Sequence, residues 1–148
     1  MKHKRTYIWI FSLLMLLVLG FNFYFHFRLN RFDGVTMVAI DGSAHAEGVS
    51  VLLENQTNND VESGNASILR LQRRILGVWL PVWRDFTVGH TGEAFGYDAE
   101  ASHKIDLFWK YSYGSKSSGH YRIIKEFWVL HAPGDRDKFL LSAEFDIK

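Results

Sequence analysis

An uncharged run over residues 7–25, close behind a short basic N-terminus, constrains this chain more than any other feature. At about 1.5 Å per residue, a helix of this length spans about 28 Å, close to the roughly 30 Å of a hydrocarbon core. Aromatic residues crowd its far end, as they do at membrane interfaces. We therefore expect a transmembrane segment over residues 7–27, preceded by a short cytoplasmic segment at residues 1–6.

The distribution of charge divides the chain near residue 32. All 16 acidic residues lie at or after Asp33, whereas five of the 17 basic residues lie before it. The leader therefore carries +5, and residues 32–148 carry 12 minus 16, or −4, although the whole chain sums to +1. Basic residues lie on both sides of the apolar run, with the larger number before it. We expect a single-pass protein of the cell membrane with a cytoplasmic N-terminus and an extracytoplasmic body.

A cleaved signal peptide is the alternative to an anchor, and it needs small residues shortly after the apolar core. Here the core is followed by bulky aromatic residues. The Ala44-His45-Ala46 triplet lies about twenty residues too far along the chain for such a cleavage site. The pattern favours an uncleaved signal anchor, with residues 28–34 as a juxtamembrane linker.

The body, residues 35–148, alternates between apolar and polar residues with period two, which is typical of half-buried strands. The alternation predicts strands over residues 35–41, 48–54, 68–74, 78–84, 105–110, 121–129 and 139–147. Turn-forming residues separate them, notably at 55–60 and 131–137. About seven antiparallel strands with no helical periodicity predict an all-β body, an immunoglobulin-like β-sandwich, with a small barrel as the alternative.

Composition excludes several classes of function. Cysteine is absent, which removes disulfides, thiol nucleophiles and cysteine-based zinc sites. The acidic body argues against a nucleic-acid partner, and no nucleophile elbow or phosphate-binding loop is present. We expect no enzyme, no catalytic or metal-binding residues and no cofactor. The alternative, a small envelope enzyme or metal-binding protein, would use the loop at 90–103, which carries His90, Asp98, Glu100 and His103.

Three residues are candidates for binding a partner. Trp79 and Trp83 lie four residues apart on a predicted strand, so they would share one face beside Arg84. An exposed aromatic strip of this kind stacks on sugar rings or anchors a protein. The favoured alternative is that both tryptophans fill the sandwich core. The charged residues Arg122, Lys125 and Glu126 read as a solvated face with cross-strand charge pairs.

Gly119 and Tyr121 form a candidate tyrosine corner, in which a tyrosine buries its ring at the start of a strand and bonds its hydroxyl to a loop backbone. They belong to the run Tyr-Gly-x4-Gly-x-Tyr-Arg-Ile-x-Lys-Glu-Phe at 113–127, and Leu-Ser-Ala-Glu-Phe follows at 141–145. These motifs resemble a bacterial immunoglobulin-like domain family of exported Gram-positive proteins. The resemblance covers roughly residues 49–147. The chain departs from it at 94–102 and in lacking a proline before Gly119.

The resemblance implies an extracytoplasmic β-sandwich and gives no catalytic residue to transfer. Together with the anchor, it predicts a binding or interaction module of the cell envelope. Its partner would be the membrane together with another envelope protein or a wall polymer. The alternative is a structural accessory subunit of a membrane complex, since a fold alone does not fix a function.

Overall fold

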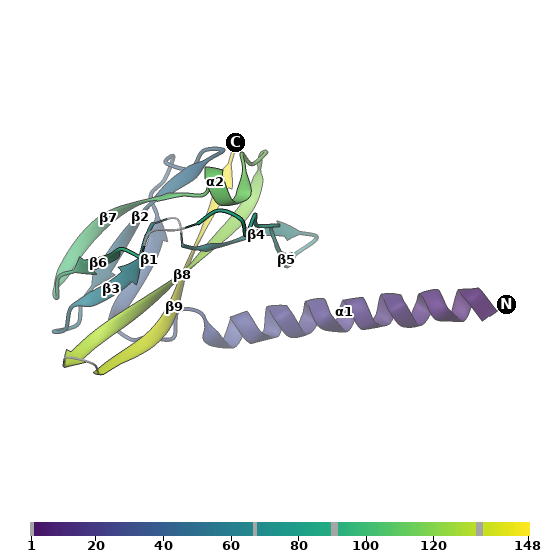
Figure 1. Cartoon of the computed structure of the whole chain (residues 1–148), viewed down its shortest axis with the longest axis horizontal. Coiled ribbons are helices and arrows are strands. Elements are labelled where there is room, and N and C mark those ends of the chain that lie inside the picture. The colour runs from purple at the N-terminus through teal and green to yellow at the C-terminus, as the bar shows by residue number, and fades with distance from the viewer. Residues whose placement is uncertain (1, 67, 90–91, 133–134) are drawn as a thin grey trace.

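The computed structural model describes residues 2–66, 68–89, 92–132 and 135–148. One long helix, α1 (Lys2–Arg28), projects from a β-rich body (Figure 1). Its segment Tyr7–Arg28 has a mean hydropathy of 2.1, and only 6% of its most apolar stretch is buried. A core helix of a soluble protein would be mostly buried. By length and composition, α1 can therefore cross a membrane.

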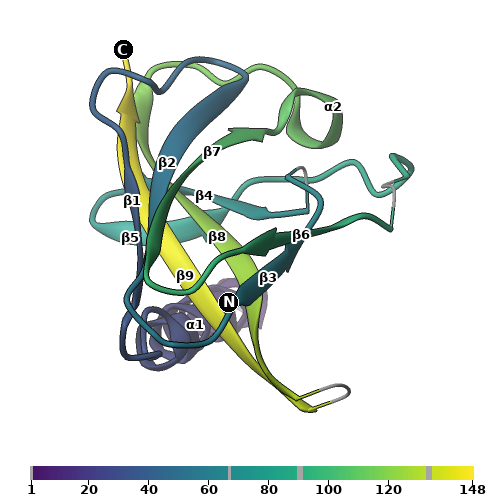
Figure 2. The ribbon, with the colours of Figure 1, turned by 90° about the vertical axis from the view of Figure 1, so that its left-hand side faces the viewer.

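The described part of the body contains nine strands and one short helix. They are β1 (Val35–Ala39), β2 (Gly48–Asn55), β3 (Val61–Gly64), β4 (Arg70–Ile75), β5 (Val78–Pro81), β6 (Ala94–Tyr97), β7 (Ala101–Phe108), α2 (Lys110–Tyr113), β8 (Gly119–Ala132) and β9 (Asp135–Ile147). Antiparallel pairing places β1, β2 and β7 in one sheet and the other six strands in a second. Figure 2 shows the two sheets facing each other, with α1 beneath the larger one.

The long strand β8 organises the larger sheet. β9 pairs with β8 along one edge from Gly119 to Ala132. On the other edge, β4 pairs with residues 121–124 and β3 pairs with residues 127–129. β5 extends the sheet beyond β4, and β6 extends it beyond β3. Both β5 and β9 are therefore edge strands.

The predicted strands are confirmed, each with shifted ends. Two strands, β3 and β6, were not predicted, because their sequences Val-Glu-Ser-Gly and Ala-Phe-Gly-Tyr do not alternate between apolar and polar residues. The predicted strand at 78–84 ends at Pro81, and α2 adds one helical turn that periodicity did not indicate. The barrel alternative is wrong, because the ladders of the described residues form two separate sheets. The predicted turn at Pro133-Gly134 lies outside the described residues.

The larger sheet buries apolar side chains on both faces. Alternation along β8 points Ile123 toward the smaller sheet and Ile124 to the opposite side, and both are buried. Ile123 belongs to the main core between the sheets. Ile124 belongs to a second cluster with Phe25, Leu29 and Leu140. The end of α1 therefore covers the outer face of the sheet.

Two asparagines fix this covering segment to both edges of the larger sheet. The Asn22 carboxamide donates to the carbonyl of Trp79 on β5 at 3.0 Å and accepts from the Trp79 N–H at 3.0 Å. Asn30 does the same on β9, where its Oδ1 accepts from the Ser142 N–H at 2.8 Å and its Nδ2 donates to the Ser142 hydroxyl. The segment from Asn22 to Asn30 therefore crosses the three strand spacings from β5 to β9, roughly 14 Å.

Residues 28–34 were predicted as a linker. The two residues that follow α1, Leu29 and Asn30, pack on the body. Leu29 is buried and bridges to Leu140 of β9. The N–H of Asn30 donates to the Leu140 carbonyl at 2.9 Å. The helix end and the body therefore form one packed unit.

The candidate tyrosine corner has the expected geometry. The Tyr121 ring is buried, and its hydroxyl donates to the Ser117 carbonyl at 3.0 Å. Gly119 has a φ of +154°, and a Cβ there would lie 3.0 Å from the Arg73 guanidinium. Glycine therefore allows both the turn and the close approach of Arg73.

Candidate functional site at the junction of the helix and the body

A groove of about 500 Å³ lies where α1 meets β4 and the segment that follows β5. Its volume falls within the range of small-ligand sites in proteins. Most of its lining side chains are aromatic or aliphatic, and they are joined by two arginines and one glutamine. The lining residues are Phe21, Phe25, Arg70, Leu71, Gln72, Pro81, Val82, Trp83, Arg84, Phe86 and Tyr113. We call this feature the junction groove.

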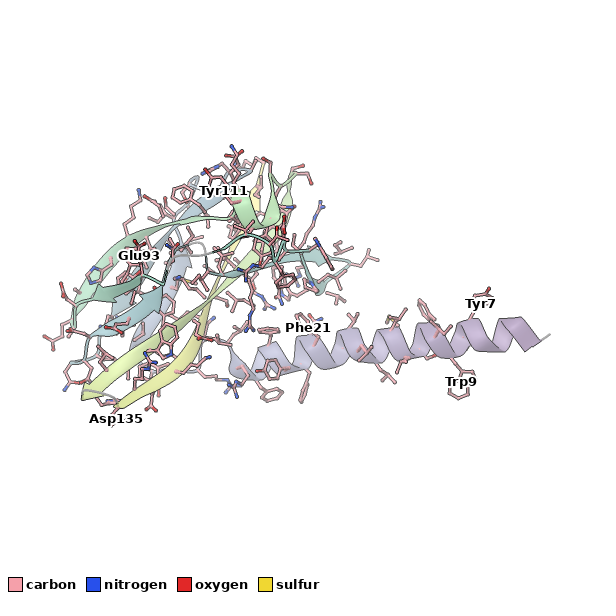
Figure 3. All side chains as sticks on the ribbon, in the orientation of Figure 1. Tyr7, Trp9, Phe21, Glu93, Tyr111 and Asp135 are labelled. Atoms are coloured by element: carbon pink, nitrogen blue, oxygen red, sulfur yellow. The ribbon has the colours of Figure 1, made fainter. Side chains whose placement is uncertain are left out.

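One wall of the junction groove comes from α1. Phe21 and Phe25 lie one helical turn apart with their rings edge to face at 4.8 Å. Phe21 is the labelled ring on the side of α1 that faces the body (Figure 3). The guanidinium of Arg70 lies 5.8 Å from the centroid of the Phe25 ring. The apolar helix therefore supplies the aromatic rings of this wall, and one of these rings lies next to a cation.

The opposite wall comes from the segment after β5. Trp83 is 84% exposed and Phe86 is 76% exposed, and their rings meet edge to face at 6.5 Å. Arg84 lies between them in sequence, with its guanidinium 5.6 Å from the Phe86 centroid. Large exposed rings that touch each other beside a cation form a ready surface for an apolar ligand.

The chain holds this second wall in place through Asp85. The Asp85 N–H donates to the Ser112 carbonyl at 2.7 Å, which ties the segment to α2. Its carboxylate accepts from the hydroxyl of Thr87 at 2.6 Å and from the Thr87 N–H at 2.9 Å. These hydrogen bonds lower the pKa of Asp85 below its ordinary value. The exposed rings on either side of Asp85 are therefore presented on a fixed turn.

Trp79 and Trp83 do not form the single strip that their spacing predicts. β5 ends at Pro81, between the two residues, so they leave the strand geometry that would align them. Trp79 is half-buried between Arg122, at 4.5 Å from its ring centroid, and His120, at 5.3 Å. The favoured alternative, that both tryptophans fill the core, is wrong for the exposed Trp83, and Trp79 packs outside the main core cluster.

The tryptophan of the sandwich core is Trp109. It is 1% exposed, its ring stacks on Phe145 at 5.5 Å, and its Nε1 donates to the Ala46 carbonyl at 3.0 Å. The alternation of Ile105, Leu107 and Trp109 in the predicted strand at 105–110 carries the signal for this position.

Arginines concentrate at the junction, a feature that the sequence pattern did not predict. Of the six arginines after residue 32, five lie on β4, after β5 or at the start of β8. Each guanidinium in this group lies within 6 Å of an aromatic ring centroid; the five are Arg70, Arg73, Arg74, Arg84 and Arg122. Residues 70–84 contain four arginines and no acidic residue, so a local charge count would have found the cluster that the total of −4 hides.

Two residues predicted to lie on a solvated face are buried. Arg122 is 8% exposed, and its Nε donates to Gln72 Oε1 at 2.9 Å. Lys125 is 1% exposed, and its Nζ donates to the carbonyls of Gly64 and Asn65, each at 2.8 Å. The predicted cross-strand partners, Glu144 and Asp146, lie against His120 instead. Glu126 pairs with Lys138 of β9 at 2.6 Å.

The alternative site at 90–103 does not come together in the described residues. His90 lies outside them. The ring of His103 packs on Tyr97, and Glu100 occupies a turn with a φ of +52°. Among the residues that the structure describes, no three histidine, aspartate or glutamate side chains are placed to hold a metal ion.

A comparison of the chain with protein-family models, with curated proteins and with solved structures gives no significant match.

Proposed function

We propose that the protein is a single-pass, membrane-anchored binding module that holds an amphiphile in the junction groove. The amphiphile has a hydrocarbon tail and a phosphate-bearing head. The observation that carries this proposal is the wall formed by Phe21 and Phe25, because both residues belong to the helix segment long enough to cross a bilayer. A groove lined by that segment opens beside the lipid, so a ligand enters it without crossing water.

The lining matches the two ends of such a ligand. The rings of Phe21, Phe25, Trp83 and Phe86 offer apolar surface to the tail. Arg70 and Arg84 supply cationic forks, and a guanidinium binds phosphate oxygens in a bidentate manner. Phospholipids and lipid-linked phosphates share this chemistry.

Packing at the junction supports an anchor that is retained rather than cleaved. Phe25 and Leu29 are buried against Ile124 and Leu140, and Asn22 bonds the edge of β5. Cleavage near residue 25 would remove the bonds of Asn22 and open the buried cluster. We propose that the three basic residues before the apolar run stay in the cytoplasm and that the body lies outside. Intact-mass analysis of the membrane fraction tests this, and a mature chain that starts beyond Phe25 would contradict it.

The architecture of the body supports an immunoglobulin-like β-sandwich. Two antiparallel sheets pack face to face around a core that includes one buried tryptophan, Trp109. The hydroxyl of Tyr121 returns to the loop backbone in the manner of a tyrosine corner. We propose that the body belongs to this class of fold and acts by binding rather than by catalysis.

The test measures lipid that stays bound to the full-length chain. The protein is reconstituted into nanodiscs of neutral phosphatidylcholine doped either with phosphatidylglycerol or with a polyprenyl phosphate, then extracted and examined by native mass spectrometry. We expect retention of one dopant, which identifies the source of the ligand. Trp83→Ala should reduce this retention several-fold. Tyr111→Ala is the matched control, since Tyr111 is 79% exposed and does not line the groove. Figure 3 shows it on α2.

Charge substitutions separate the two ends of the ligand. Arg70→Gln combined with Arg84→Gln should weaken retention of either anionic dopant and leave the weak retention of phosphatidylcholine unchanged. Equal retention by the wild type, the Trp83 variant and the arginine variant would overturn the proposal. A separate affinity pull-down from a detergent extract of membranes tests the accessory-subunit alternative. Recovery of another membrane protein in stoichiometric amounts, with no lipid in the groove, would favour that alternative.

A further inference from the structure

The tip of the β4–β5 hairpin carries a leucine in an unusual setting. Leu76 is 99% exposed, and Ile75 beside it is 45% exposed. Leu76 has a φ of +50° and Gly77 a φ of +82°, so both central residues of the turn are left-handed. Asparagine, aspartate and glycine are the usual residues at such positions. Leucine therefore disfavours the turn and exposes apolar surface at the same time.

The hairpin lies beside the apolar helix. The two bonds between Asn22 and Trp79 join them, and Figures 1 and 2 both show the hairpin alongside α1. Asn22 precedes Arg28, the last residue of α1, by six residues, or about 9 Å along the axis. From this join, the hairpin tip projects toward the side on which the free length of α1 extends (Figure 1).

Two cations adjoin the apolar tip, because Arg73 and Arg74 precede Ile75 on β4. Arg28 and Arg31 lie farther back, at the end of the helix and near β9. Apolar residues on the bilayer side with arginines behind them form the arrangement of a segment that enters the interfacial layer. There the guanidinium groups reach lipid phosphates while the aliphatic side chains reach the upper acyl chains.

We propose that the hairpin tip at residues 75–78 is a second membrane contact, inserted into the interfacial layer of the leaflet from which the body emerges. The depth is limited because a turn exposes backbone polar groups, which hydrocarbon does not solvate. The proposal goes beyond the binding of an amphiphile in the junction groove. It concerns a separate surface and shares only the membrane anchor with the proposed function.

The absence of cysteine from the chain permits a direct measurement of depth. Three single-cysteine variants of the full-length protein are made: Leu76→Cys at the tip, Tyr111→Cys on α2 and Leu16→Cys within the apolar helix. Each carries a nitroxide, and electron paramagnetic resonance measures its collisions with oxygen and with a water-soluble nickel complex in nanodiscs containing phosphatidylglycerol. Leu76 and Tyr111 are both largely exposed, so neither label disturbs a buried position.

The expected result is a ratio of oxygen to nickel collisions at residue 76 several-fold above that at residue 111 and approaching that at residue 16. A label at residue 76 that behaves like the label at residue 111 would overturn the proposal. The same result is expected if the tip binds another protein in cells, because that protein is absent from the nanodisc, and it would count equally against membrane insertion. Failure here leaves the lipid retention of the junction groove unaffected, so the two proposals fail separately.

Discussion

The carboxamide of Asn22 forms with the backbone of Trp79 the pair of hydrogen bonds that a neighbouring strand would form. Both bonds measure 3.0 Å and connect residues 57 positions apart in the sequence. Trp79 lies on the edge strand β5, whose outer N–H and C=O groups have no partner strand within the described part of the chain. A polar side chain within an apolar helix is costly in lipid unless it has such a partner. The pairing thus accounts for Asn22 within the apolar run.

Asn22→Ala should release the edge of β5 from the helix. It removes both partners of Trp79, so we expect the free energy of unfolding in detergent to fall by about 1–3 kcal/mol. Hydrogen exchange at the Trp79 amide should become faster. Asn30→Ala is the matched control, because it removes the corresponding bonds at Ser142 and should speed exchange there alone. An unchanged exchange rate at Trp79 in the Asn22 variant would refute the assigned role.

Tyr121→Phe tests the tyrosine corner. The substitution removes the hydroxyl that donates to the Ser117 carbonyl and leaves the buried ring in place. We expect a loss of about 1 kcal/mol in the free energy of unfolding. Tyr111→Phe removes a hydroxyl from a residue that is 79% exposed and should leave stability unchanged. Chemical denaturation of the full chain in the same detergent compares the two variants, and equal stabilities would argue against the corner.

Lys125 should make stability depend on pH in the alkaline range. Burial lowers the pKa of Lys125 to about 8, from its ordinary value of 10.5. Between these values the unfolded chain binds more protons than the folded chain, so the free energy of unfolding should rise with pH. The slope should reach at most about 1.4 kcal/mol per pH unit. Thermal unfolding at pH 7.5 to 10.5 measures it. Lys125→Met should remove this slope, and a slope that persists would assign it to another group.

Leu76→Asn should stabilise the fold. Asparagine adopts positive φ more readily than leucine, so relief at this position should add about 1 kcal/mol to the free energy of unfolding in detergent. Gly77→Ala provides the contrast, since alanine at a φ of +82° should destabilise the same turn. Denaturation midpoints of both variants check this prediction. A less stable Leu76→Asn variant would show that Leu76 makes a favourable contact within the fold.

The alternation of apolar and polar residues predicted most of the strands, because it indicates which side chains along a strand are buried. It also placed Lys125 on the same face of β8 as Ile123 and Phe127, and only the charge of Lys125 argued for solvent. The structure resolves this conflict through long-range geometry. β4 and β3 share one edge of β8, and the connection between them brings the carbonyls of Gly64 and Asn65 onto the Lys125 ammonium. No local sequence pattern predicts this contact between the Lys125 ammonium and the two carbonyls.

The sequence predicted only one of the two walls of the junction groove. Trp83 and Arg84 were candidates because exposed aromatic and cationic residues at a surface bind partners. The other half of the junction groove belongs to Phe21 and Phe25, which the pattern assigned to a leader separate from the body. Hydropathy describes how a helix meets lipid and carries no information on the sheet against which its end packs. The docking of α1 therefore had to come from the structure.

The attachment of α1 to both sheet edges has a consequence for reach. A body on a slack tether samples a wide volume around its anchor, whereas one bonded at Asn22 and Asn30 turns with its helix as a single piece. Asp135, at the far end of the β8–β9 hairpin (Figure 3), then keeps a constant height above a bilayer that holds α1. A partner that binds this end must therefore present its binding surface at the same height above the bilayer. The protein would then act as a spacer of fixed length.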